Sequence, residues 1–157
     1  MKQLQPLEDD AIKLLKLCSQ YGHTVIVTNA AQGWVQQSGR RFVPKIIQYL
    51  ESTKTPIISA QTKYAHFCPT DPGVWKKKAF VHLLSERGMT LVSIGDSIFE
   101  REAAHYASRQ CKTALTKTVK FVDSPTVSQL RMQIGNLTDK MPSIMGHGGS
   151  IDVDIEC

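Results

Sequence analysis

Polar and charged side chains stand where three apolar segments of this chain end. Thr28 and Asn29 follow the first segment, Ser59 closes the second, and Gly95-Asp96-Ser97 follows the third. If the segments are parallel strands, their carboxyl ends share one edge of a sheet, which is where open α/β proteins bind ligands. The Asp96 carboxylate is the strongest signal, because an ion beside an apolar strand is costly to bury unless a metal or a paired group compensates it. The pattern predicts a binding site at that edge.

A lysine and a second carboxylate complete the candidate site. Lys76 lies near the start of an expected helix that could bring its ammonium group to the same edge, and Glu100 follows Asp96 by four residues. Lysine binds phosphate as a point charge, and Mg²⁺ prefers carboxylates together with phosphate oxygens and water. The set therefore suits a phosphate group and a magnesium ion. Structural alternatives stay open: Asp96 as a helix cap, Glu100 as a complement to a helix dipole, and Lys76 as a solvated lysine.

Alternating strands and helices are expected to position these residues. Short apolar or alternating runs predict strands at residues 24–27, 56–60, 91–94, 119–122 and 151–155, the last as a terminal edge strand. Helical periodicity predicts helices at residues 7–20, 43–50, 74–87, 98–107 and 127–141. Ser124 is the expected cap of the last helix, with Pro125 at its first position. This order is typical of an α/β fold with a parallel sheet under helices, and we expect a single domain over residues 1–157.

Composition limits the partners and the compartment. The 157 residues are 41% hydrophobic and 21% charged, with a net charge of +5. No apolar run approaches the roughly 18–20 residues needed to span a membrane, so we expect no membrane partner and a cytoplasmic location. The basic residues are scattered without interleaved aromatic residues, so we expect no nucleic acid partner. The four cysteines are far apart and are interpreted as free thiols.

Three motifs, taken in order, resemble the haloacid dehalogenase-like superfamily. They are TVIVTNA at residues 24–30, WKKKAF at residues 75–80 and VSIGDSIFE at residues 92–100. More narrowly, residues 27–34 match a V-T-N-A-x-x-G-W segment that resembles a eukaryotic group of uncharacterised members. The resemblance covers about residues 7–155. It implies a three-layer, Rossmann-like parallel sheet with helices on both faces.

The resemblance also implies a role for each candidate residue. In that superfamily the Thr or Ser of the second motif binds the transferring phosphoryl group; Thr28 matches it, and Asn29 lies beside it at the phosphate site. The lysine of the third motif steadies the nucleophile and the phosphate, and Lys76 is the best match. Two neighbouring lysines compete for that role: Lys77 and Lys78. The acidic residues of the fourth motif hold Mg²⁺, and those that match are Asp96 and Glu100.

The superfamily's first motif, a strand ending in D-x-D, has no good match. Its first Asp is the nucleophile that becomes an aspartyl phosphate, and its second is the general acid/base. Asp9-Asp10 lies in an expected helix, and Asp152-Val153-Asp154 lies near the other terminus, where only a circular permutation would make it central. We expect a sheet that lacks its usual first central strand, in a chain truncated at the amino terminus. The strands ending at Thr28 and Asp96 would then pair directly or expose open edges.

Three functions compete. The first is a domain of phosphatase ancestry that is inactive alone, with Mg²⁺ binding weak or lost, or a fragment of a longer magnesium-dependent phosphatase. The second is a non-catalytic interaction module that binds a copy of itself or a partner chain through exposed sheet edges. The third is a Gly-Asp-Ser esterase with Ser97 as nucleophile. That enzyme needs a late Asp/His pair, and here His147 is the only late histidine while Ile144 occupies the usual Asp position.

Overall fold

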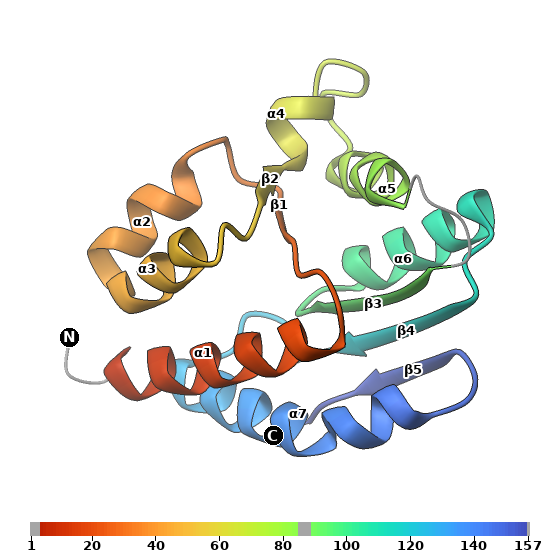
Figure 1. Ribbon diagram of the computed structural model, residues 1–157. Coiled ribbons are helices and arrows are strands. Elements are labelled where there is room, and N and C mark those ends of the chain that lie inside the picture. The colour runs from red at the N-terminus through yellow and green to blue at the C-terminus, as the bar shows by residue number, and fades with distance from the viewer. Residues whose placement is uncertain (1–3, 85–88, 157) are drawn as a thin grey trace.

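A computed structural model describes residues 4–84 and 89–156 of the chain (Figure 1). Within these residues the fold is α/β, as the sequence predicts, with seven helices and five strands. The helices are α1 (Leu4–Tyr21), α2 (Trp34–Phe42), α3 (Pro44–Ser52), α4 (Ala60–Tyr64), α5 (Pro72–Leu83), α6 (Ile98–Cys111) and α7 (Val127–Gly146). The strands are β1 (Ile26–Thr28), β2 (Ile57–Ser59), β3 (Thr90–Gly95), β4 (Leu115–Lys120) and β5 (Ile151–Asp154). None of the described helices is both long enough and apolar enough to cross a bilayer.

The strands form two parallel sheets instead of one. β1 pairs with β2, with Ile26 opposite Ile57 and Thr28 opposite Ser59. In the other sheet β4 is central, between β3 and β5, so β5 is an edge strand as predicted. Over the described residues no ladder joins β1 to β3. The strands that end at Thr28 and next to Asp96 therefore do not pair directly, and each sheet keeps an open edge.

The apolar core covers both faces of the three-stranded sheet (Figure 1). On one face α1 and α7 pack against β4 through a buried cluster: Leu7, Leu14, Val119, Phe121, Ile134, Leu137, Met141, Ile144 and Ile155. On the other face α5 packs against α6 through a second cluster: Phe80, Leu84, Ala103, Ala104 and Ala107. Burial of a large apolar side chain contributes about 1.5–3 kcal/mol, so these clusters hold the helices on the sheet. On α6 the alanines form the buried face, whereas Phe99 and Tyr106 are exposed.

Strand β4 begins earlier than predicted. The prediction placed it at residues 119–122, whereas it spans Leu115–Lys120. The error arose because Thr116, Lys117 and Thr118 are polar, yet all three are buried. Lys117 is tolerated because its ammonium group donates to three carbonyl oxygens at the end of α7, at 2.7–2.9 Å: those of Ile144, Met145 and His147. A cation there satisfies carbonyls that the helix leaves unpaired and complements its dipole.

Helix boundaries also differ from the predictions. Thr126, not Ser124, caps α7, through a capping box in which Thr126 and Gln129 each accept the other's backbone N–H. The helix predicted at residues 74–87 begins at Pro72, and residues 85–87 of that prediction lie outside the described residues. Helices α2 and α4 were not predicted. The buried Glu8 carboxylate accepts from the Lys45 backbone N–H at 2.7 Å, in the first turn of α3, and this contact was not predicted either.

Candidate functional site

The turn from β3 into α6 is built by a capping box. Ser97 is the N-cap: its Oγ accepts from the Phe99 N–H at 3.2 Å. Glu100 reaches back, and its Oε2 accepts from the Ser97 N–H at 3.0 Å and from the Ser97 Oγ at 2.6 Å. Such a box satisfies backbone donors that a helix start leaves free. The cap is therefore Ser97 and not Asp96, the alternative that the sequence left open.

Gly95 is required by the same turn. The Glu100 side chain folds back over Gly95, and a Cβ at that position would overlap three side-chain atoms of Glu100. Two residues earlier, the Ser93 Oγ donates to the Glu100 carbonyl oxygen at 3.4 Å, from β3 to α6. The Gly-Asp-Ser sequence thus holds Glu100 against the carboxyl end of β3.

Helix α5 delivers Lys76 to this carboxylate. The helix starts sharply because Asp71 caps it, accepting from the Gly73 and Val74 N–H groups at 3.0 and 3.2 Å. The Lys76 ammonium contacts Glu100 Oε1, and the two side chains are only 11% and 12% exposed. Burial lowers the pKa of Lys76, and the nearby Asp96 carboxylate opposes that shift. Lys76 and Glu100 therefore meet at the carboxyl end of β3, beside Asp96, which is exposed and not the buried carboxylate that its place after an apolar strand suggested.

The two competing lysines point elsewhere. Lys77 Nζ lies over the Tyr106 ring, 5.8 Å from its centroid. Lys78 Nζ lies over the Phe67 ring at 5.0 Å. Both distances are within the range of cation–π contacts. Lys76 is thus the member of the lysine run that faces the candidate site.

The end of β1 is tied to the same helix. The Asn29 Nδ2 donates to the carbonyl oxygen of Pro72 at 3.3 Å, in the first turn of α5. Its Oδ1 is shielded from solvent and has no hydrogen-bond partner among the described residues. Thr28 makes a local contact instead, since its Oγ1 accepts from the Ala30 N–H at 3.0 Å. Asn29 is therefore joined to the helix that carries Lys76, whereas Thr28 shapes the turn after its own strand.

The carboxylates as arranged do not fit a resident magnesium ion. Glu100 Oε1 contacts Lys76 and Oε2 accepts from Ser97, so both oxygens are engaged. Over residues 4–84 and 89–156 there is no group of three or more His, Cys, Asp or Glu side chains that could hold a metal ion. Mg²⁺ demands near-ideal octahedral oxygen coordination. Asp96 and Glu100 could bind Mg²⁺ as a carboxylate pair only if the contact between Glu100 and Lys76 were broken.

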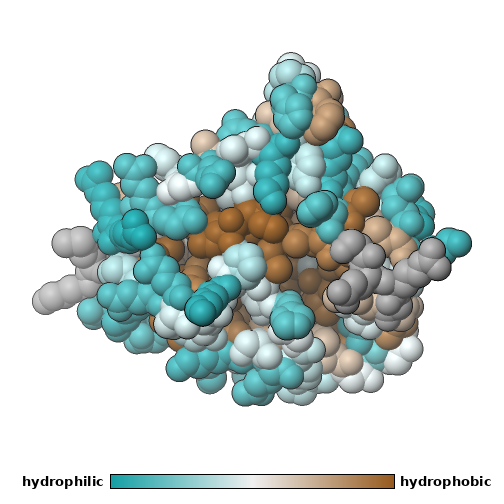
Figure 2. Space-filling view, turned by 45° about the horizontal axis from the view of Figure 1, so that its top comes forward, coloured by the Kyte–Doolittle hydropathy of each residue, from teal (hydrophilic) through white to brown (hydrophobic). Residues whose placement is uncertain are grey.

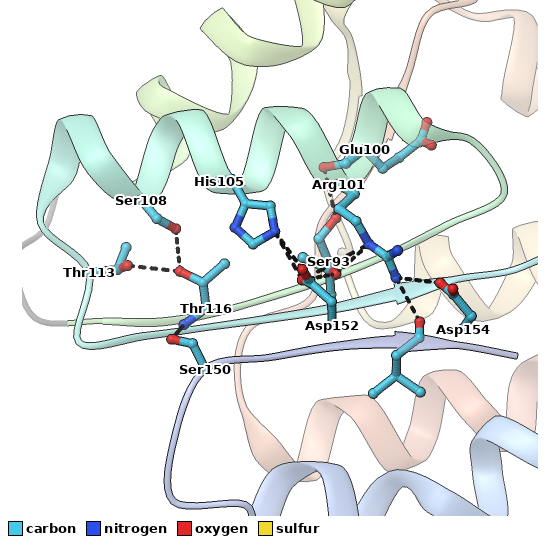
Figure 3. Close-up of polar contacts among 12 residues, drawn as sticks. Ser93, Glu100, Arg101, His105, Ser108, Thr113, Thr116, Ser150, Asp152 and Asp154 are labelled. Atoms are coloured by element: carbon cyan, nitrogen blue, oxygen red, sulfur yellow. Dashed lines mark hydrogen bonds and ion pairs between the residues drawn. The ribbon is translucent and has the colours of Figure 1, made fainter.

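A polar network that the sequence analysis did not find joins α6 to the far edge of the sheet (Figure 3). Arg101 Nε donates to the Thr118 Oγ1 at 2.8 Å. Its Nη2 donates to the Val153 carbonyl oxygen at 2.8 Å and forms an ion pair with Asp154 at 2.8 Å. The guanidinium group thus clamps β4 and β5 to α6.

Asp152 belongs to the same network. Its carboxylate accepts from the Thr118 Oγ1 at 2.6 Å and lies 2.9 Å from the His105 Nε2. Partial burial raises the pKa of Asp152, but the Thr118 hydrogen bond and the charges of His105 and Arg101 outweigh it, so the pKa is lowered. The alternation of the D-x-D segment and the i, i+4 spacing of Arg101 and His105 were the signals that could have predicted this network. On edge strand β5, these aspartates hold the sheet to α6 and do not occupy a central position.

The geometry supports neither the Gly-Asp-Ser esterase nor Asp9-Asp10 as the missing nucleophile motif. Ser97 Oγ is engaged with Glu100 and Phe99 and follows the carboxyl end of β3. His147 hydrogen-bonds to Gly149 at 3.0 Å and precedes β5. It therefore lies at the amino ends of the parallel strands, opposite to the carboxyl end of β3. An esterase pair of Ser97 and His147 is therefore not assembled. Asp9 and Asp10 form surface ion pairs from α1, with Lys45 at 3.3 Å and Arg131 at 2.8 Å.

Comparison of the chain with protein-family models, curated proteins and solved structures gives no match.

Proposed function

We propose that this chain is a haloacid dehalogenase-like domain of phosphatase ancestry that does not hydrolyse phosphate esters on its own. The proposal includes the three-layer, Rossmann-like arrangement implied by the order of its sequence motifs. It rests chiefly on one observation: the buried Lys76 ammonium lies with Asp96 and Glu100 at the carboxyl end of a parallel strand. This is the edge of an open α/β sheet at which ligands bind.

The geometry also supports the proposed lack of turnover. The Lys76 ammonium contacts Glu100, so it is not free to steady a phosphate or a nucleophile. Loss of a covalent nucleophile leaves only positioning and electrostatic effects, which give a small residual rate. We infer that the retained side chains form an internally neutralised remnant of a phosphoryl-transfer site.

An assay with a chromogenic phosphate ester and Mg²⁺ tests the absence of activity. We expect no turnover above the uncatalysed rate for the wild-type chain, and the same for Asp96→Asn. Robust turnover that Asp96→Asn abolishes would refute the proposal. That result would favour the alternative that the chain is a fragment of a working magnesium-dependent phosphatase. A contaminating enzyme could not explain it, because the activity of a contaminant would not respond to the substitution.

Phosphate binding tests the site itself. Glu100→Gln removes the carboxylate that neutralises Lys76, so we expect inorganic phosphate to bind the variant several-fold more tightly than the wild-type chain. Glu102→Gln is the matched control, because Glu102 is an exposed carboxylate on the same helix. Amide chemical shifts of Asn29, Lys76 and Asp96 give the readout. Equal phosphate affinity in both variants would show that Lys76 is only a structural partner of Glu100.

A further inference from the structure

The free edge of β1 presents the backbone of Val27. The Ile26 N–H donates to the Pro56 carbonyl oxygen at 2.9 Å, so the backbone groups of Ile26 face β2. In a strand, the N–H and C=O of successive residues alternate between the two edges. Thr28 therefore also faces β2, and Val27 faces away from it.

The same alternation indicates that the free edge of β3 presents the backbone groups of three residues. The Gly95 carbonyl oxygen accepts from the Phe121 N–H at 2.8 Å, so Gly95, Ser93 and Leu91 face β4. The backbone groups of Thr90, Val92 and Ile94 then point to the other edge. Within the described residues no strand pairs with this edge.

Both free edges lie beneath the same helices. Val27 of β1 and Leu91 of β3 pack against one cluster, the cluster that joins α5 to α6. The side chains of Leu91, Val92 and Ile94 are only partly buried, whereas residues 116–119 of central strand β4 are fully buried. Figure 2 shows apolar atoms gathered across the middle of the face in view. We call the region bounded by Val27 and by Thr90, Val92 and Ile94 the strand slot.

We propose that the strand slot binds an extended apolar segment of a partner polypeptide, which adds as a β-strand between β1 and β3. Two open edges offer backbone donors and acceptors on both sides of the slot, and an extended backbone is the structure that pairs with both. The partly buried, mostly apolar side chains of the flanking strands select β-branched or other apolar residues for the segment.

A separate polypeptide is the occupant that fits best. All five strands of the described residues are already paired in the two sheets, so a second copy has no spare strand to donate. The shielded Oδ1 of Asn29, just beyond the end of β1, has no donor among the described residues. A backbone N–H at the end of an inserted segment would supply one.

The test uses a fluorescein-labelled peptide, Lys-Thr-Val-Ile-Val-Thr-Lys, whose five central residues repeat residues 24–28 and so include β1. We expect saturable binding by fluorescence anisotropy, and at least about tenfold weaker binding when proline replaces the peptide's central Ile, because proline removes a backbone donor. Val92→Pro removes an N–H that points into the slot and not toward β4, so it should weaken binding similarly. Ile57→Pro is the matched control, because the backbone of Ile57 faces the outer edge of β2, opposite to β1.

Hydrogen exchange on the wild-type chain gives a readout that needs no variant. The amides of Val92 and Ile94 should exchange rapidly in the free chain and become protected when the peptide is added, while the amide of Ser93 is protected throughout. No peptide binding, or binding that Ile57→Pro weakens as much as Val92→Pro, would overturn the proposal. Concentration-dependent protection of Val92 without peptide would assign the slot to a second copy instead. The inference does not depend on the phosphatase ancestry, because peptide binding and phosphate binding are read out separately.

Discussion

The contact between Lys76 and Glu100 joins α5 to α6, and its energetic coupling can be measured directly. The perturbation is a double-mutant cycle of Lys76→Met, Glu100→Gln and the two together. Both side chains are almost fully buried, so each single variant leaves the other group in a low-dielectric environment without its main partner. The double variant buries neither charge.

The structure sets the expected sizes. Breaking a buried ion pair by removing one partner costs about 3–5 kcal/mol in general. Here the Glu100 carboxylate keeps two hydrogen bonds from Ser97, so Lys76→Met should cost less, about 2–3 kcal/mol. Glu100→Gln should cost about 1–2 kcal/mol, because Lys76 keeps the attraction of Asp96. The double variant should cost about as much as Glu100→Gln alone, so the coupling energy should equal the cost of Lys76→Met, about 2–3 kcal/mol.

Urea unfolding followed by far-UV circular dichroism at pH 7 measures each free energy of unfolding. A matched cycle on Arg40 and Glu51, an exposed pair at 2.7 Å with side chains 66% and 52% exposed, should give less than about 1 kcal/mol. Independent sites add to within about 0.5 kcal/mol. A Lys76–Glu100 coupling below that limit would refute the buried ion pair and the neutralised site that depends on it.

Two further predictions concern polar residues of β4 and β5: Lys117 and Asp152. Lys117→Met should lower the free energy of unfolding by about 2–3 kcal/mol, because it leaves carbonyl oxygens at the end of α7 without their donor; unchanged stability in urea would contradict this role. Asp152→Asn should lower the melting temperature at neutral pH. Because the folded-state pKa of Asp152 lies below its ordinary value of 3.8, the carboxylate stabilises the fold above pH 3.8 and this contribution is lost as the pH falls through the folded-state pKa. Melting curves should therefore show the difference between wild type and variant shrinking below pH 3.8, and a difference independent of pH would argue against the Thr118 and His105 contacts.

Much of the fold could be predicted because its signals are local. Apolar runs located β1, β2, β3 and β5, and the alternation of strands with helices predicted parallel pairing. Strand β4 was misplaced because the burial of Lys117 depends on carbonyl groups 27–30 residues away in the chain. A lysine among threonines has no local signal that distinguishes a buried strand from a loop.

The candidate site, likewise, was predictable only where its contacts are local in the sequence. The sequence by itself determined that a carboxylate turn follows an apolar strand. The capping box of Ser97 and Glu100 spans only three residues and was therefore readable from the sequence, but Asp96 was considered as the cap instead. Tertiary structure alone decided that Lys76, and not its neighbours, reaches Glu100, because that depends on how α5 packs against α6. It also decided that, over the described residues, β1 and β3 do not pair with each other, because backbone pairing between distant strands depends on where the helices place them. The residue types of the site are thus a property of the sequence, and their neutralisation and the open strand slot are properties of the packing.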